Sequence, residues 1–369
     1  MNMVYMKLGD ICSPKQWKTI STSELTSEGY PVYGANGIIG YYKEYNHIKE
    51  TILVTCRGAT CGSVNITRPY SYVNGNAMAL DNLDERFDIN YLYFYLSYRG
   101  FNDVISGSAQ PQIIRSAIEK ILIPLYPIEQ QRKIASLFIK INNIHDLYRK
   151  ENDRLDELIK SRFIEIFGDP ENNNKAWKVK FLDNLCTVGS SKRIYQSEQS
   201  SEGIPFWRIS DLVSKIDTGT VDSELFISKT KYAELEQAGL VPVTGDILLT
   251  SRGTLGKCYI IKDEDRFYFQ DGMISWLGNY SEEITPIYLQ YLFSMSGFRK
   301  QINRLQAGST VAYLSIAMLK KLQVMVPDKT LQEQFAGFVA QIDKSKSAIQ
   351  AALDKTQLLF DSLMQEYFG

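Results

Sequence analysis

Two glycine-containing segments are the first places in this sequence where side chains could do chemistry. They read TCRGATCG at 55–62 and TSRGTLGK at 250–257. The segment at 250–257 resembles a phosphate-binding loop, but a Walker A loop needs four residues between its glycines and a Ser or Thr after its Lys. Here the two glycines enclose two residues and Cys258 follows the Lys, so we expect no nucleotide binding by this loop.

An arginine occupies the same place in both segments, Arg57 in the first and Arg252 in the second. We interpret each segment as a strand, a tight turn helped by glycine and a returning strand, with the Arg entering the turn. A guanidinium there could fork onto a guanine edge or a phosphate, and it could also bind backbone carbonyls of its own hairpin. Because both segments keep the Arg, we favour a structural or phosphate contact over readout of a particular base.

A further pair of segments begins with Gly-Ser, GSAQPQI at 107–113 and GSTVAYL at 308–314. A glycine beside a hydroxyl could bring backbone N–H groups to a phosphate, and a plain turn before the next strand is equally open. The residues that follow differ between the segments, which suits base reading because Gln can make two bonds to adenine. Exposed loop residues of this kind are nevertheless more often ordinary surface residues than base contacts. The differing residues are Gln110, Gln112 and Arg115 against Val311, Tyr313 and Ile316.

The composition limits what else the chain could do. The five cysteines have no CxxC spacing and only two histidines accompany them, so we expect neither structural zinc nor disulfides. The net charge of -1 gives no overall basic signature, so any contact with nucleic acid must come from local patches or from a partner. Neither a methyltransferase motif nor a nuclease or helicase constellation occurs, and we expect no catalysis by this chain alone.

Length and hydropathy give two further expectations. The chain has 369 residues, more than one hydrophobic core usually serves, so we expect at least two domains. It contains no run of about 18 apolar residues, and its first ten residues lack the pattern of a signal peptide. We therefore expect a cytoplasmic protein.

The regions that must position these segments occur twice. Displaced by 174 residues, the stretch around Cys12 falls on the stretch around Cys186. The displacement is 195 at the two arginines and 201 from the Gly-Ser segments onward, where EIFG at 165–168 matches EYFG at 366–369. Because the displacement only grows, the second copy carries inserted loops, most of them between about 212 and 248. A period this long indicates duplication of a whole domain.

Each copy combines a β-rich region with a long helix. Residues 1–125 contain short runs rich in Tyr, Val and Ile, such as TILVT at 51–55, and one helical stretch at about 89–105. Residues 180–327 repeat this plan. Each copy is expected to be a mixed α/β globule with a twisted sheet.

The two long helices are predicted from spacing. From Ile128 to Phe167 there is no Gly or Pro, and apolar residues recur in alternating steps near three and four, which predicts a coiled-coil seam. The other helix is Leu331–Phe368. Because the connection at 168–181 is short, the second globule begins where the first helix ends, and the helices are expected to pack antiparallel. Polar residues on the seam are expected to specify its register. They are His145, Asn152 and Lys346.

The order and duplication of these motifs resemble the DNA-specificity (S) subunit of type I restriction-modification enzymes. In each copy an apolar strand runs into the long helix, as ILIPLYPIEQQRKIASLF at 121–138 and LQVMVPDKTLQEQFAGFV at 322–339. YPVYGANGIIGYY at 30–42 and IPFWRISDL at 204–212 are also similar to the family's target-recognition openings. The resemblance covers nearly the whole chain.

This resemblance implies a non-catalytic adaptor of the α+β class, with two α/β target-recognition domains in pseudo-two-fold duplication separated by two long antiparallel coiled-coil helices. Each domain would read one half of a split double-stranded DNA target, and the helices would fix the unread gap. The implied boundaries are 1–126 for the first recognition domain, 127–168 for the first spacer helix, 169–327 for the second domain and 328–369 for the second helix.

The resemblance also implies partners. The helices would dock two methyltransferase (M) subunits, which use S-adenosylmethionine to methylate adenine. No cofactor is therefore expected in this chain itself. Two restriction (R) subunits, ATP-driven motors with nuclease activity, could join the complex.

The candidate DNA contacts are polar and basic residues of the segments above and of neighbouring turns. They are Lys15, Asn36, Arg57, Thr60, Ser108, Gln110, Gln112, Arg115, Lys192, Arg208, Arg252, Thr254, Ser309 and Tyr313. On the first helix, Leu137, Ile144 and Leu158 lie beside the seam, where a partner subunit could add packing. Trp207 and the many tyrosines are expected in core or turn packing rather than as base-stacking platforms.

A function of another class fits the same architecture. The chain could be a two-headed scaffold that binds proteins or other ligands, with the helices as a dimerisation spacer. DNA affinity separates the two hypotheses, because binding through phosphates falls steeply as salt rises.

Overall fold

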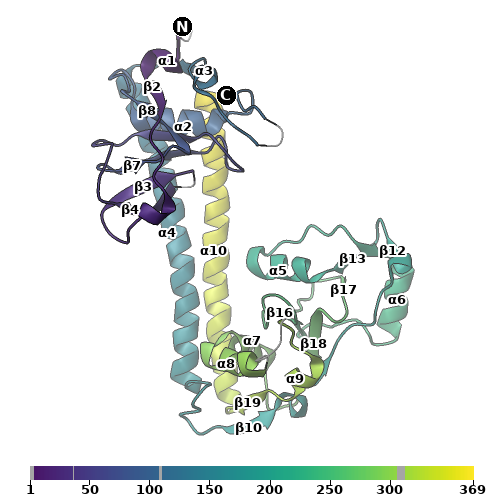
Figure 1. The fold of residues 1–369 in the computed structure, drawn as a ribbon. Coiled ribbons are helices and arrows are strands. Elements are labelled where there is room, and N and C mark those ends of the chain that lie inside the picture. Colours follow the sequence, from purple (N-terminus) through teal and green to yellow (C-terminus); the bar gives the residue numbers. More distant parts are fainter. Residues whose placement is uncertain (1–3, 36, 108–109, 306–311) are drawn as a thin grey trace. The chain divides into compact units, whose positions relative to one another are not determined.

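The computed structural model describes residues 4–35, 37–107, 110–305 and 312–369. It divides into two compact units. Unit 1 contains Met1–Lys150 and Gln350–Gly369, and unit 2 contains Glu151–Ile349. The two long helices, α4 (Ile128–Phe167) and α10 (Lys329–Phe368), therefore each contribute one part to unit 1 and the other part to unit 2 (Figure 1).

Unit 1 is built mainly from short strands. Ahead of α4 its elements are β1 (Tyr5–Lys7), α1 (Leu8–Ile11), β2 (Ser13–Gln16), η1 (Thr22–Glu24), β3 (Tyr30–Gly34), β4 (Gly37–Tyr42), β5 (Ile52–Thr55), β6 (Val64–Ile66), β7 (Tyr72–Val73), β8 (Ala77–Asp81), α2 (Ile89–Arg99), α3 (Arg115–Ile118) and β9 (Leu122–Pro124). A four-stranded antiparallel sheet has the order β2-β8-β5-β6. Another sheet has the order β4-β3-β7, in which β3 and β7 run parallel, and β1 pairs with β9.

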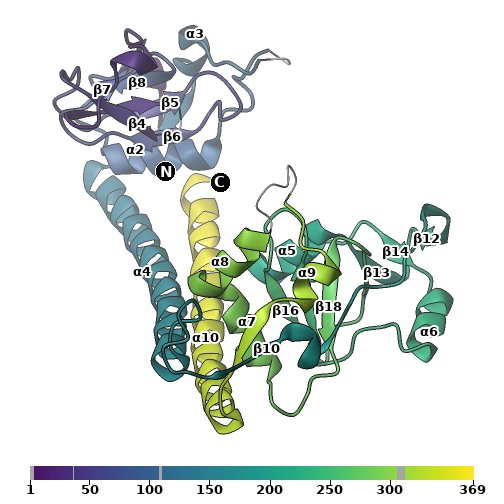
Figure 2. The ribbon, with the colours of Figure 1, turned by 60° about the horizontal axis from the view of Figure 1, so that its bottom comes forward.

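Strand β5 is buried on both faces, which explains its unbroken apolar sequence. Ile52 and Val54 belong to the core that includes residues of α2 and α4, whereas Leu53 packs with Tyr33 and Val73 on the opposite face. Helix α2 lies between this sheet and the two long helices (Figure 2).

Unit 2 repeats the plan with additions. After α4 its elements are β10 (Lys178–Phe181), η2 (Leu182–Asn184), β11 (Thr187–Gly189), η3 (Gln196–Glu198), β12 (Gln199–Ser200), β13 (Ile204–Trp207), α5 (Ile209–Thr218), β14 (Phe226–Ile227), α6 (Lys229–Gln237), β15 (Ile247–Thr250), β16 (Cys258–Ile260), β17 (Tyr268–Phe269), β18 (Ile274–Gly278), α7 (Pro286–Ser294), α8 (Ser296–Leu305), α9 (Ile316–Lys320) and β19 (Gln323–Val326). The antiparallel sheet β11-β18-β15-β16 has the same strand order as its counterpart in unit 1.

The remaining strand pairs also match between the units. Strand β13 pairs in parallel with β17, as β3 does with β7, and β10 pairs with β19 as β1 does with β9. The predicted duplication is therefore confirmed at the level of sheet topology.

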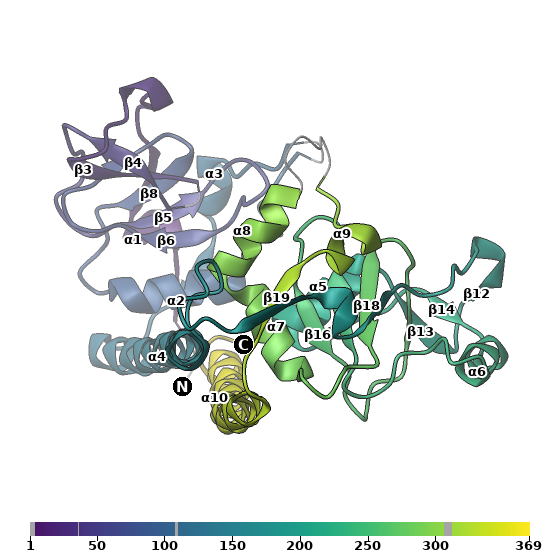
Figure 3. The same cartoon turned by 90° about the horizontal axis from the view of Figure 1, so that it is seen from below.

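The inserted residues of the second copy form an addition to unit 2. Helices α5 and α6 and strand β14 stand between β13 and β15, where unit 1 has strand β4 between β3 and β5. Figure 3 shows α6 and the strands β12, β13 and β14 together on one side of β18. The predicted location of the extra length, between about 212 and 248, agrees with these elements.

The long helices pack antiparallel in each unit. In unit 1, Phe368 at the end of α10 stacks on Phe138 near the start of α4, with ring centroids 5.7 Å apart. In unit 2, Phe167 at the end of α4 meets Phe335 near the start of α10 at 5.4 Å. The repeated Phe-Gly that closes each helix is thus a repeated docking contact, because Phe368 also meets Tyr91 of α2 and Phe167 meets Tyr288 of α7.

Two of the three polar residues predicted on the seam, His145 and Lys346, contact the opposite helix. His145 is buried and its Nε2 lies 2.8 Å from Thr356 Oγ1 of α10. Lys346 forms an ion pair with Asp156 of α4. The side-chain oxygen of Asn152 is buried without a hydrogen-bond partner among the described residues.

Two details differ from or refine the predictions. The helix expected at about 89–105 ends at Arg99, because Gly100 adopts a φ of 65° that favours glycine and its N–H closes the last turn on Leu96. Trp207 is buried and stacks on Phe267 with ring centroids 3.5 Å apart, so its assignment to core packing is confirmed.

Candidate nucleic-acid interface

In unit 1 the arginine segment and the Gly-Ser segment come together. Residues 55–62 form the turn between β5 and β6, closed by hydrogen bonds from Thr55 N to Ser63 O and from Gly62 N to Thr55 O, both 2.8 Å. The predicted strand, turn and returning strand are therefore confirmed. Arg57 lies in a β-bridge with Gln112, and Ile113 N donates to Cys56 O at 3.0 Å. The exposed side of this junction carries Arg57 and Gln112.

Unit 2 builds the same junction from its own residues. The turn between β15 and β16 is closed by Thr250 N and Lys257 O at 3.0 Å, and Leu314 N donates to Ser251 O at 2.9 Å. Arg252 lies in a β-bridge with Tyr313, and its guanidinium carbon stands 5.0 Å from the centroid of the Tyr313 ring. The two units therefore present an arginine at equivalent places, beside Gln112 in one and Tyr313 in the other.

The charge of both arginines is available to a ligand. Arg57 and Arg252 are exposed, and no carboxylate within the described ranges lies at ion-pair distance from either. Lys257 at the end of the unit 2 turn differs, because its Nζ binds both carboxylate oxygens of Asp217 at 2.6 Å. An exposed guanidinium can give two parallel hydrogen bonds to a phosphate or to a guanine edge.

The base of the unit 1 junction is neutral and buried. Burial raises the pKa of the Cys56 thiol, although Gln16 and Arg57 act in the opposite direction. Gln16 Nε2 donates to Cys56 Sγ at 2.9 Å and to Gly75 O at 3.0 Å. A buried neutral thiol is a poor nucleophile, so we expect no covalent chemistry from Cys56. We assign it a structural role beneath the turn that carries Arg57.

The other predicted DNA contacts in unit 1 are more scattered. Lys15 is exposed on β2 and its Nζ stands 3.7 Å from the centroid of the Trp17 ring. Thr60 lies in the arginine turn, where its carbonyl accepts from Ser63 N. Gln110 is exposed, and Arg115 at the start of α3 forms an ion pair with Glu119 at 2.7 Å. Three predicted contacts, Asn36, Ser108 and Ser309, lie outside the described residues.

In unit 2, Thr254 is exposed in the arginine turn, and Thr250 Oγ1 donates to its carbonyl. Lys192 is exposed, with its backbone N–H on the hydroxyl of Tyr268 at 2.8 Å. Arg208 is the N-cap residue of α5 and its guanidinium binds Glu224 at 3.0 Å. The structure thus brings Thr254 together with the Arg252 junction and places Arg208 in a local ion pair.

A cluster of exposed aromatic side chains in unit 1 was not predicted. Tyr30, Tyr45 and Tyr70 are 37%, 40% and 50% exposed, and their rings meet edge to face at 4.8 and 5.3 Å. A concentration of Tyr at 30–45 was the available sequence signal. Such rings can stack on bases or pack against a protein, and the sequence did not distinguish them from the buried tyrosines.

The predicted partner-binding residues lie on α4. Ile144 is 38% exposed, Leu158 is 47% exposed and Leu137 is half-buried. The two long helices expose further apolar side chains that were not predicted as partner contacts. These are Leu147 and Ile164 on α4 and Leu358 and Leu359 on α10.

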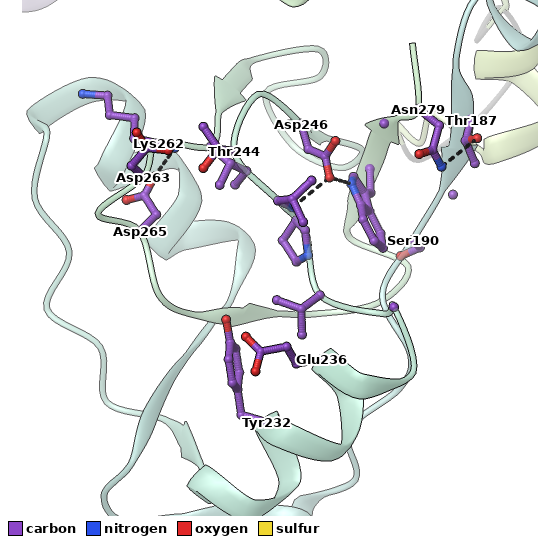
Figure 4. Close-up of a pocket in the computed structure, with 18 residues that line it drawn as sticks. Thr187, Ser190, Tyr232, Glu236, Thr244, Asp246, Lys262, Asp263, Asp265 and Asn279 are labelled. Atoms are coloured by element: carbon purple, nitrogen blue, oxygen red, sulfur yellow. Dashed lines mark hydrogen bonds between the residues drawn. The ribbon is translucent and has the colours of Figure 1, made fainter.

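A cavity of about 610 Å³ in unit 2 contains none of the predicted DNA contacts among its lining residues. Figure 4 shows Asp246 at this cavity, with hydrogen bonds to its carboxylate. Asp246 Oδ2 accepts hydrogen bonds from Trp276 Nε1 at 2.8 Å and from Val243 N at 2.9 Å. Burial raises the pKa of the Asp246 carboxyl, and these two hydrogen bonds act in the opposite direction.

The part of the chain that the structure describes contains neither a metal-binding cluster nor a membrane-spanning helix. Those residues contain no group of three or more His, Cys, Asp and Glu side chains arranged to hold a metal ion. Within the same ranges, no helix combines the length and the apolar character needed to cross a membrane.

Comparison with known proteins identifies the family. A family model described as the type I restriction modification DNA specificity domain matches two segments, residues 1–157 and 174–356. The chain belongs to the type I restriction-modification DNA-specificity family. The two matched segments of this specificity-family chain correspond to the two copies seen in the sheets.

Specificity subunits of two named organisms are similar to this protein over most of its chain. A putative type I restriction enzyme specificity subunit of Haemophilus influenzae is 26% identical over 362 residues, covering 95% of this chain and 89% of the relative. The MjaVIII specificity subunit of Methanocaldococcus jannaschii is 24% identical, covering 83% of this chain and 77% of the relative.

Solved structures of the specificity family have the same fold. The type I restriction-modification S subunit from M. genitalium matches with a TM-score of 0.63 at 18% identity, covering 100% of this chain and 96% of the other. A structure concerned with complex assembly and conformational transition of a type I R-M system matches with a TM-score of 0.56 at 15% identity, covering 99% and 97%. The predicted fold, two α/β domains with long antiparallel helices, is confirmed.

Proposed function

We propose that this chain is a non-catalytic DNA-specificity subunit in which each α/β domain reads one half of a bipartite target. The observation that carries the proposal is the repeated junction of an arginine turn with a Gly-Ser segment. Arg57 and Arg252 stand in equivalent backbone positions without a carboxylate partner among the described residues, whereas their bridge partners are Gln112 and Tyr313. A shared cation suits the phosphate backbone, and differing neighbours suit different base sequences.

The charge distribution is consistent with local rather than overall attraction. The formal net charge is -1, so the electrostatic part of DNA binding must come from these junctions and from the partner subunits. In this proposal the recognition domains are residues 1–126 and 169–327, and the spacer helices are 127–168 and 328–369. Lys15, Lys192 and the residues around each turn extend the contact.

The long helices supply the proposed docking surface for two M subunits. They expose Ile144, Leu158 and further leucines, and apolar side chains on an otherwise charged helix suit a protein partner. S-adenosylmethionine would bind to the M subunits, and two R subunits could join the same complex. The site of action would be the cytoplasm, where chromosomal DNA is accessible.

The experiment that tests the proposal is a map of methylated adenines in the host genome, with and without this chain. The expected result is a split motif with a fixed gap that disappears when the chain is deleted. If deletion of the chain removed only a continuous motif, the proposal that two domains each read one half-site would be contradicted. Binding of the chain with its M partner to DNA should also fall steeply with salt, and a flat response would favour the two-headed scaffold.

A further inference from the structure

Each long helix carries a fully buried glutamine in its first turn. Gln131 of α4 and Gln332 of α10 are both 0% exposed, and they are 201 residues apart, as the duplicated copies are in this region. A buried amide is costly unless its donors and acceptor are bonded. The NH2 group and the oxygen of each of these two amides form hydrogen bonds with backbone groups.

In unit 1 the Gln131 side chain binds two different backbone segments. Its Nε2 donates to Arg86 O at 2.9 Å and to Tyr126 O at 2.7 Å, and its Oε1 accepts from Asp88 N at 2.9 Å. Asp88 is the N-cap of α2, and Tyr126 leads into α4. One side chain therefore joins the start of the domain helix to the start of the spacer helix.

Unit 2 repeats these three backbone bonds and adds a fourth bond, from Thr285 Oγ1 to Gln332 Oε1 at 3.2 Å. Gln332 Nε2 donates to Glu283 O at 2.9 Å and to Pro327 O at 2.8 Å, and its Oε1 accepts from Thr285 N at 2.9 Å. Thr285 is the N-cap of α7, the counterpart of α2. The two copies agree although their surrounding residues differ, since Arg86, Asp88 and Tyr126 correspond to Glu283, Thr285 and Pro327.

A further directional bond reinforces each joint. Tyr91 of α2 donates its hydroxyl to Pro124 O at 3.0 Å, and Tyr288 of α7 donates to Met325 O at 3.0 Å. Both acceptors lie on the strand that leads into the long helix. Hydrogen bonds fix angles as well as distances, whereas apolar packing is non-directional, so these bonds restrict rotation of each domain about its own helix.

We propose that Gln131 and Gln332 are positioning residues that set how strictly the protein discriminates the gap between its two half-sites. This rests on the proposed function. One base pair more or less in the gap shifts a half-site by about 3.4 Å and turns it by roughly 35°. A domain held at a fixed angle to its helix cannot follow that rotation, so a target with the wrong gap is rejected even when both half-sites are correct.

The test uses the complex with its M subunits and DNA duplexes that carry the split target found in the host methylome. The gap in these duplexes is native, one base pair shorter or one base pair longer. The variants are Gln131→Met and Gln332→Met, which keep the length of the side chain and remove the hydrogen bonds of its amide. The matched controls are Gln130→Met and Gln334→Met, at exposed positions of the same helices.

The measured quantity is the ratio of methylation rates on native-gap and altered-gap duplexes. We expect this ratio to fall on the order of tenfold in each buried-position variant, because the free energy of one net hydrogen bond corresponds to about that factor. The ratio should stay unchanged in the controls. Equal slowing on all three duplexes, with an unchanged ratio, would show a purely stabilising role and overturn the proposal. Absence of gap discrimination in the wild-type complex would instead reveal failure of the proposed function.

A measurement on the wild-type chain covers the case in which both variants fail to fold. The backbone N–H groups of Asp88 and Thr285 should exchange with solvent as slowly as the amides in the middle of α4 and α10. Rapid exchange at these two positions would mean that the glutamine joints open freely, and the proposal would be wrong.

Discussion

At the scale of single residues, the proposed DNA contacts centre on Arg57 and Arg252. Both emerge from a tight turn, both lack a carboxylate partner within the described residues, and each lies in a bridge with a residue of the Gly-Ser segment. The difference between Gln112 and Tyr313 beside them is the feature that suits two distinct half-sites. The buried glutamines of the helices act on orientation rather than on base contact.

Replacing each arginine distinguishes phosphate contact from base readout. If Arg57 binds phosphate, Arg57→Ala should weaken binding to all sequences alike and lower the slope of log affinity against log salt by about 1. Readout of guanine would instead cost about 1–3 kcal/mol at one base position and relax specificity there. Arg86→Ala, which removes an arginine paired with Asp84 at 2.7 Å, is the control and should leave affinity unchanged. We expect the first outcome for both Arg57 and Arg252, by titration of labelled duplexes at several salt concentrations.

Asp246 makes the stability of unit 2 depend on pH. Burial raises the pKa of its carboxyl above the ordinary value of 3.8, so the folded state favours the protonated form. The destabilisation by Asp246 is therefore absent well below pH 3.8 and grows as pH rises from 3.8 through the raised value. Asp246→Asn removes this ionisation. The melting temperature of the variant relative to wild type should be higher at about pH 7 than at about pH 4, and the reverse order in a thermal scan would contradict this prediction.

At the scale of elements, the end of each long helix packs against the start of the other long helix. The two long helices could be predicted from the spacing of apolar residues along the sequence. Their equivalent ends, EIFG and EYFG, could be recognised because they are 201 residues apart, as the copies are in this region. The junction of Arg57 with Gln112 could not be predicted, since it depends on how two segments 55 residues apart meet in space. The buried roles of Gln131 and Gln332 were also missed, because a glutamine on a polar helix ordinarily faces solvent.

The closing phenylalanine of α4 should be a major stabiliser of unit 2. Phe167 is fully buried against Phe163, Tyr288 and Phe335, so Phe167→Ala should lower the free energy of unfolding by about 3–5 kcal/mol. Ile164→Ala on the same helix, where the side chain is 41% exposed, should cost far less. Urea unfolding followed by tryptophan fluorescence compares the two variants, and equal losses would contradict the docking of this helix end.

The exposed apolar side chains of α4 should contribute to M-subunit docking and little to folding. Ile144→Glu and Leu158→Glu should each weaken association with the M subunit by about tenfold or more, if these positions are central to the interface. Lys160→Glu, at an exposed polar position of the same helix, is the control. Calorimetry with the purified M subunit measures the affinity, and unchanged binding in both the isoleucine and the leucine variant would place the interface elsewhere.

At the scale of the whole molecule, duplication gives the chain two units built on the same plan. The sheets β2-β8-β5-β6 and β11-β18-β15-β16 share strand order, and each unit adds the start of one long helix and the end of the other. Each unit therefore has its own core and its own arginine junction. Which bases are read depends on loop geometry and DNA shape, and the order of residues along the chain does not encode these directly.

Exchange of residues 1–126 for the matching domain of another specificity subunit shows whether each unit reads its own half-site. The measurement is the map of methylated adenines in cells that express the chimera with its M subunit. We expect one half of the split motif to change, while the other half and the gap length stay as they were. A change in both halves, or in neither, would mean that the two units do not read one half-site each.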